Sequence, residues 1–85
     1  MAYAIRFKPA ALRQFEKLSR DMQKRISARI ADLQNNPFPS ECKKLSGVSD
    51  AWRIRAGDYQ VVYQVRREIL LVLILTVGHR REICR

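Results

Sequence analysis

The apolar stretch from Ile69 to Val77 constrains the fold of this chain more than any other segment. It is nearly continuous, consists mostly of leucine, isoleucine and valine, and ends at Gly78. It is far shorter than the roughly 20 residues that a membrane helix needs. A run of this length and composition is typical of a central strand covered on both faces, and the glycine lets the backbone bend where the strand ends. The stretch therefore predicts a sheet that organises the rest of the chain.

Two more strands come before this run. In residues 52–56 apolar side chains alternate with arginines, so the two-residue period of a strand places them on opposite faces. The apolar members are Trp52, Ile54 and Ala56, and the basic members are Arg53 and Arg55. Residues 56–58 form a turn in which Gly57 is free to adopt positive φ, and residues 59–65 form the next strand.

The amino-terminal half predicts one strand and two helices. Residues 3–7 alternate between apolar and other side chains, as a half-buried strand does. Pro9 fits the first turn of a helix that continues to about Leu18. Ser19 is suited to the N-cap of a second helix, whose apolar stripe runs through residues 22–33. We expect the two helices to form an antiparallel hairpin packed on the sheet.

The order of these elements predicts an α+β fold. An N-terminal strand is followed by an antiparallel helical hairpin and then by a three-stranded antiparallel sheet, in the order βααβββ. The 85 residues suffice for one small domain, and a hydrophobic content of 47% argues against disorder.

The net charge of +9 is large for a chain of this size. Residues 1–42 carry eight Lys and Arg against four Asp and Glu, and residues 43–85 carry nine against four. Since both halves are basic, the charge belongs to the folded body and not to a tail. It favours binding to RNA, DNA, ribosomes or an acidic protein. A solvated basic surface without a specific partner is the alternative.

Several kinds of site have little support. The chain has one histidine and two distant cysteines, and it lacks a Gly-rich phosphate loop, so we expect neither a metal nor a cofactor. The eight acids are dispersed. No secretory signal is visible, and we interpret Cys42 and Cys84 as reduced thiols. These features predict a cytoplasmic protein that does not associate with a membrane.

Arginines are the main candidates for function. Arg53 and Arg55 would lie about 7 Å apart on one strand face, and Arg80 and Arg81 follow the end of the apolar run. A guanidinium offers a rigid fork of donors to a phosphate and keeps its charge. RNA carries its own nucleophile, the 2′-OH, so an arginine site that bends the backbone into line would cleave RNA without a metal. A plain anion-binding face is the other interpretation.

A set of ordered motifs resembles the RelE branch of the RelE/ParE toxin superfamily. The motifs are Leu45-Ser46-Gly47, Trp52-Arg53-Ile54-Arg55, Gly57-Asp58-Tyr59, Val62-Tyr63 and Gly78-His79-Arg80-Arg81-Glu82. The resemblance covers nearly the whole chain and implies one RelE-like toxin domain over residues 1–85. It also implies a toxin of a type II toxin–antitoxin module that cleaves mRNA on the ribosome. A cognate antitoxin would neutralise it, and the toxin would reach operator DNA only through the antitoxin complex.

The resemblance also implies roles for individual residues. Arg53 and Arg55 would grip the scissile phosphate and the adjoining backbone, and Arg80 would stabilise charge in the transition state. The chain departs from the family pattern at two positions. Gln60 stands where the family often has an arginine, and Cys84 stands where it often has a tyrosine. We therefore expect weakened catalysis, with Gln60 limited to hydrogen bonding with the RNA.

Three other residues complete the predicted site. Lys44 and Arg81 would contact RNA. His79, next to the predicted catalytic arginine, is our candidate for proton transfer, because an ordinary imidazole pKa lies near 6.5. The thiol of Cys84, with a reference pKa of about 8.5, is the other proton carrier that we consider.

Two other functions remain open at this stage. One is a non-catalytic toxin of the ParE type that acts on DNA gyrase. The other is a degenerate toxin that persists as an antitoxin-binding, operon-regulating partner.

Overall fold

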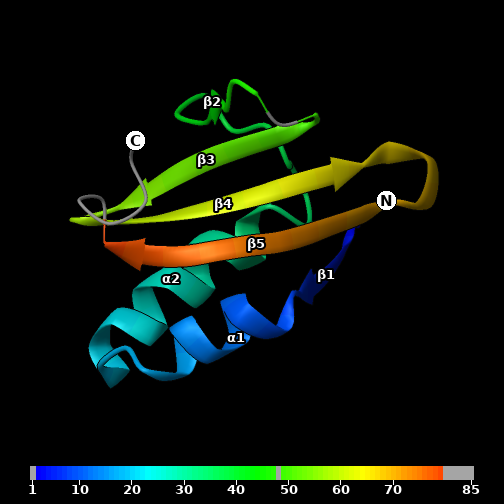
Figure 1. Cartoon of the computed structure of the whole chain (residues 1–85). Coiled ribbons are helices and arrows are strands. Elements are labelled where there is room, and N and C mark those ends of the chain that lie inside the picture. The colour runs from blue at the N-terminus through cyan, green and yellow to red at the C-terminus, as the bar shows by residue number, and fades with distance from the viewer. Residues whose placement is uncertain (1, 48, 80–85) are drawn as a thin grey trace.

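The computed structural model describes residues 2–47 and 49–79, which form one sheet with two helices on one of its faces (Figure 1). In chain order the elements are β1 (Ala4–Phe7), α1 (Pro9–Glu16), α2 (Arg20–Asp32), β2 (Lys43–Lys44), β3 (Ala51–Ala56), β4 (Tyr59–Arg66), a 3-10 helix η1 (Arg67–Ile69) and β5 (Leu71–His79). The predicted α+β class, with a strand, a helical hairpin and further strands, is confirmed. Neither helix has the length and apolar content that crossing a bilayer requires.

The sheet has the strand order β1-β5-β4-β3-β2. The pairings of β5 with β4, β4 with β3 and β3 with β2 are antiparallel, and β1 pairs with β5 in parallel. A parallel pair needs a long connection. Here the helical hairpin and the strands after it separate β1 from β5 in the chain, and the hairpin covers one face of the sheet (Figure 1).

Two features of the sheet differ from the prediction. The described chain has five strands in one sheet, because the N-terminal strand joins it and Lys43–Lys44 adds a short edge. A two-residue strand has no periodicity that a sequence could reveal. Gly78 does not end the last strand, which continues to His79, because Gly78 pairs with Gln60 in the ladder.

The helical hairpin is fixed by side chains at its corner. α1 ends at Glu16, slightly before the predicted end. The backbone N–H of Met22 donates to the Ser19 hydroxyl at 3.2 Å, which confirms the predicted N-cap. The Gln23 amide reaches back from α2 and donates to carbonyls in the last turn and the corner of α1, including those of Phe15 and Leu18. The amide thus adds to the Leu18 N–H, which donates to the Phe15 carbonyl at 3.1 Å, in satisfying the carbonyls where α1 ends.

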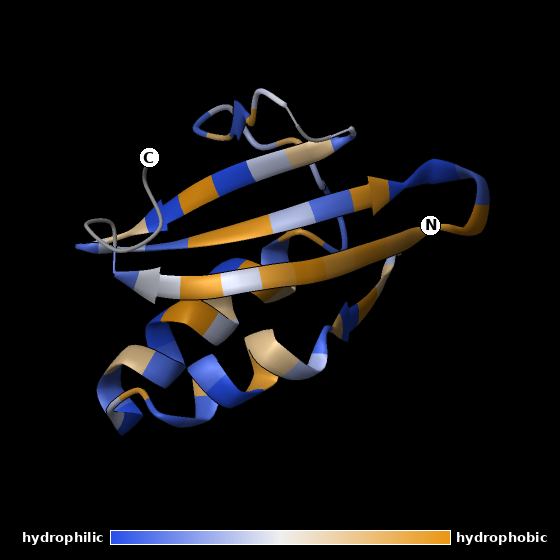
Figure 2. Cartoon of the chain, in the orientation of Figure 1, coloured by the Kyte–Doolittle hydropathy of each residue, from blue (hydrophilic) through white to orange (hydrophobic). Residues whose placement is uncertain are grey.

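The core lies between the helices and the sheet, where α1, α2, β3, β4 and β5 all contribute apolar side chains. In Figure 2, β5 is almost continuously apolar, whereas β3 alternates between apolar and polar residues. Burial on β5 nevertheless alternates: Val72 and Ile74 are buried, while Leu71 and Leu73 are only half-buried. The prediction that both faces of this strand are covered is therefore wrong for the described residues, because both helices pack on the same face.

Tyr63 ties the sheet to the loop after α2. Its side chain is fully buried, and its hydroxyl donates to the Pro37 carbonyl oxygen at 2.8 Å. Burial raises the pKa of the Tyr63 phenol, and the neighbouring Cys42 thiol raises it further. The tyrosine is thus held in its neutral form as a packing residue.

Tyr63→Phe should lower the free energy of unfolding by about 1–3 kcal/mol, because it leaves the Pro37 carbonyl without its donor. Urea denaturation at neutral pH would measure the loss, with half-buried Tyr3→Phe as the control.

The wild-type protein should also lose stability above about pH 10, where the unfolded chain releases the phenol proton that the folded chain retains. This loss should be smaller in Tyr63→Phe, and equal pH profiles for the two proteins would contradict the assignment.

Candidate functional site

Strand β3 places two arginines on the face of the sheet that is turned away from the helices. Ile54 is buried in the core, and the arginines on either side of it point the other way. Arg53 is half-buried and Arg55 is exposed. This arrangement confirms the face that the alternating sequence predicts.

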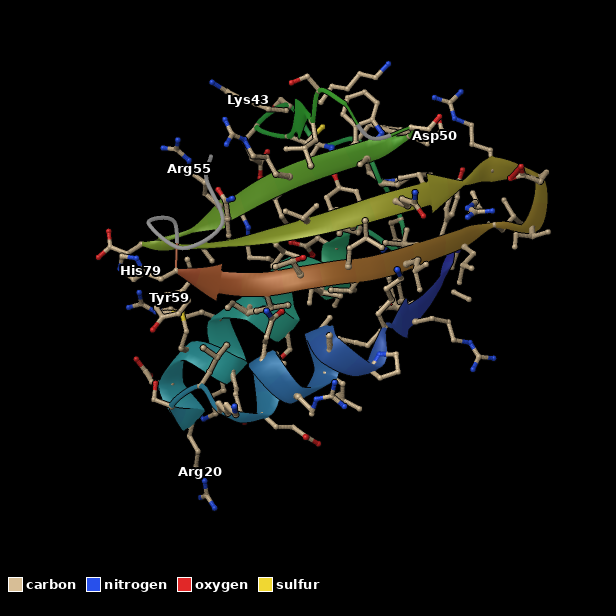
Figure 3. All side chains as sticks on the ribbon, viewed as in Figure 1. Arg20, Lys43, Asp50, Arg55, Tyr59 and His79 are labelled. Atoms are coloured by element: carbon tan, nitrogen blue, oxygen red, sulfur yellow. The ribbon has the colours of Figure 1, made fainter. Side chains whose placement is uncertain are left out.

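The neighbouring strands extend this row of side chains. Residues directly opposite each other in a ladder share a face of the sheet. Lys43 of β2 lies opposite Arg53, and Gln60 of β4 lies opposite Arg55. In Figure 3, the labelled Lys43 and Arg55 occupy the same side of β3. The sheet thus brings together three cations and one amide.

The predicted RNA contact Lys44 does not belong to this row. It lies opposite Trp52, and its Nζ is 5.9 Å from the centroid of the indole ring. Because Trp52 packs against the core, Lys44 belongs to the other face of the strand pair. Its neighbour Lys43 takes the place beside the arginines, and no pattern in the sequence distinguishes the two lysines.

Basic side chains surround a cavity of about 210 Å³ at this edge of the sheet. We call it the basic cavity, and its lining residues are Arg29, Glu41, Lys43, Arg53 and Arg55. Four of these side chains are cationic and one is a carboxylate. A concave surface lined mainly by one sign of charge concentrates the field and attracts ligands of the opposite sign. The cavity is therefore suited to an anion such as a phosphate.

Gln60 is unusual because it is a fully buried polar side chain in the sheet. Neither its Oε1 nor its Nε2 has a hydrogen-bond partner among the described residues. It lies between Arg55 on β3 and Gly78 on β5. A buried amide without partners costs about 1–3 kcal/mol. Such groups in native proteins call for an explanation, and a functional role is one of the explanations.

His79 lies on the other face of the sheet. It is opposite Tyr59, and the two rings meet edge to face with centroids 5.4 Å apart (Figure 3). A register shift explains this position: Tyr63 pairs with Ile74, but Val62 pairs with Thr76. The extra residue in β5 forms a bulge. Beyond this bulge, each side chain of β5 lies on the face opposite to the one that strict alternation predicts.

The structure thus brings together Arg53, Arg55 and Gln60 from the predicted site, but it does not place His79 with them. The proposed proton transfer by His79 stays a prediction. Arg80, Arg81 and Cys84 lie outside the described residues.

Sequence reasoning missed two cations of the basic cavity. Lys43 was missed because it belongs to a strand of two residues. Arg29 lies on α2, away from the apolar stripe of that helix, where a charged residue normally indicates only solvent exposure. The cavity also contains Glu41, from the segment between α2 and β2. Only the tertiary structure brings these residues to the arginines of β3.

Comparisons with known proteins agree with this fold. The family model described as the ParE toxin of the type II toxin-antitoxin system parDE matches residues 5–84. The mRNA interferase toxin RelE of Escherichia coli K12 is 32% identical over 84 residues, which cover 96% of this chain and 87% of that protein. Toxin RelG of Mycobacterium tuberculosis is 29% identical over 86 residues, which cover 100% and 99% of the two chains.

Solved structures show the same architecture. The chain matches the toxin-antitoxin complex RelBE of E. coli with a TM-score of 0.82 and 29% identity, over 92% of this chain and 96% of the other. It matches the archaeal RelE-RelB complex from Pyrococcus horikoshii with a TM-score of 0.82 and 27% identity, over 94% and 97%. The chain therefore belongs to the RelE/ParE family of toxins from type II toxin–antitoxin systems, in its RelE branch.

Proposed function

We propose that this protein is a metal-independent endoribonuclease that cleaves mRNA on the ribosome. The observation that carries the proposal is the row of Arg53, Arg55 and Lys43 around the basic cavity at the edge of the sheet. The similarity to a protein named mRNA interferase toxin RelE supports this substrate class.

In the proposed reaction the 2′-oxygen of a ribose attacks the adjacent phosphorus. The bond from phosphorus to the 5′-oxygen of the next nucleotide breaks, which leaves a 2′,3′-cyclic phosphate and a 5′-hydroxyl. Arg53 and Arg55 hold the phosphate backbone, and we assign Arg80 to the charge that develops on the phosphoryl oxygens. Preorganised donors directed at developing charge supply the largest share of such catalysis.

Proton transfer needs a base for the 2′-hydroxyl and an acid for the leaving 5′-oxygen. His79 and Cys84 are the side chains that we propose for this role, with His79 the better suited because imidazole is the commonest general acid and base in enzymes. Because His79 contacts Tyr59 on the helix face, it would have to act at the end of the sheet and not across the basic cavity.

We further propose that a cognate antitoxin neutralises this toxin in the cytoplasm, and that the toxin reaches operator DNA only in that complex. Related toxins have been solved in complex with the antitoxin RelB. An apolar groove of about 420 Å³, lined by side chains such as Ile5, Phe7, Phe15 and Ile30, fits the apolar side of a partner segment. The net charge of +9 favours a segment that is otherwise acidic.

The test is to incubate the purified protein with mRNA-programmed ribosomes and to map the 5′ ends of the mRNA. We expect new 5′-hydroxyl ends within the ribosome-bound codons, and none when ribosomes are omitted. Intact mRNA together with gyrase-dependent DNA damage in cells would support a toxin of the ParE type instead. Intact mRNA without any toxicity would support a degenerate, regulatory partner.

A further inference from the structure

The basic cavity contains an ion pair whose members come from outside β3. Arg29 belongs to α2, and Glu41 lies in the segment that leads to β2. The Arg29 Nη2 atom is 2.7 Å from Glu41 Oε2. Glu41 is the only carboxylate among the five side chains that line the cavity.

Both members of this ion pair are partly exposed, so another anion can readily replace the Glu41 carboxylate at Arg29. The side chains of Arg29 and Glu41 are 36% and 49% exposed. Pairs of this kind contribute little, and breaking one changes an equilibrium constant by no more than about fivefold. A phosphodiester offers a guanidinium the same two-oxygen geometry as a carboxylate. An incoming phosphate would therefore replace the carboxylate at little cost.

We propose that Arg29 is a further phosphate-binding residue of this site and that Glu41 occupies its guanidinium until RNA displaces the carboxylate. The inference rests on the proposed function, because it takes RNA as the ligand of the basic cavity. Glu41 then lowers the affinity for weak anions, since each of them must compete with a built-in carboxylate. A backbone that also engages Arg53 and Arg55 gains enough contacts to win this competition.

The ion pair has a simpler possible role, which is to hold the segment after α2 against the helix. The two roles differ in how they couple to RNA binding. If the ion pair only holds the segment, removing Glu41 lowers the stability of the protein and does not raise its affinity for RNA. If Glu41 competes with RNA for Arg29, removing Glu41 raises the affinity for RNA, but only in a protein that retains Arg29.

The test compares Glu41→Gln with Glu68→Gln, which removes the same charge from η1, outside the residues that line the cavity. The probe is a fluorescein-labelled 2′-O-methyl RNA of about ten nucleotides, which keeps its phosphates but lacks the nucleophilic hydroxyl. By fluorescence anisotropy, Glu41→Gln should bind about three- to fivefold more tightly, and Glu68→Gln less than about 1.5-fold. The slope of log K against log salt should be the same in Glu41→Gln and the wild type, because Arg29 contacts a phosphate in both complexes, and it should be shallower by about 0.7 in Arg29→Ala.

The same substitution in an Arg29→Ala background separates the mechanisms. The double variant Arg29→Ala/Glu41→Gln should bind no more tightly than Arg29→Ala alone. A gain that persists in this background, or a Glu41→Gln variant that binds no better than Glu68→Gln, would overturn the inference. Failure of the proposed function has a different signature, since Arg53→Ala/Arg55→Ala would then bind the probe as well as the wild type does.

Discussion

Replacing Arg53 and Arg55 together by alanine should lower the rate of mRNA cleavage on the ribosome by at least about 100-fold. Removal of a single preorganised donor from a site that stabilises a transition-state oxyanion typically costs about 100- to 1,000-fold. The two arginines hold one backbone, so their effects should not add. The rate is best measured in single turnover on mRNA-programmed ribosomes at saturating protein, so that weaker binding does not mask the chemical step.

The fold should survive this double substitution. Both side chains point away from the core, and alternate positions of β3 supply the buried residues. A matched control is Arg13→Ala/Arg66→Ala, which removes the same charge from two exposed positions outside the basic cavity. The control should reduce cleavage by less than about threefold, as general loss of charge does. Wild-type cleavage by the Arg53/Arg55 variant, or an equal loss in the control, would refute the assignment.

The parts of the site that sequence predicts are those set by local geometry. The period of two in residues 52–56 places Arg53 and Arg55 on one face whatever the neighbouring strands do. The N-cap at Ser19 is equally local, because the hydroxyl accepts from a backbone N–H three residues later. For such features the sequence contains all the information that the structure uses.

The remaining parts depend on register and packing between distant segments. Lys43 joins the arginines only because β2 pairs with β3 in one register, and a shift by one residue would exchange it for Lys44. His79 faces Tyr59 because a bulge interrupts the ladder between β4 and β5. Arg29 reaches the cavity only because α2 packs against this sheet. None of these relationships leaves a periodic trace in the sequence.

Replacing the buried Gln60 by methionine should raise the free energy of unfolding by about 1–3 kcal/mol. Methionine keeps the unbranched shape of glutamine and removes two buried polar atoms that have no partner among the described residues. For a domain of this size, each kcal/mol corresponds to a rise in Tm of about 4–8 °C, which differential scanning calorimetry measures easily.

The matched control is Gln64→Met on the same strand, since the Gln64 amide already donates to the Ser49 carbonyl at 3.2 Å. That substitution should bring no gain. If Gln60 hydrogen-bonds RNA in place of the family's arginine, Gln60→Met should also weaken binding to a 2′-O-methyl RNA, by about three- to tenfold for one lost hydrogen bond. A stabilised variant with unchanged RNA affinity would exclude Gln60 from the site. An unchanged or lower Tm would show that the amide has partners in the folded protein.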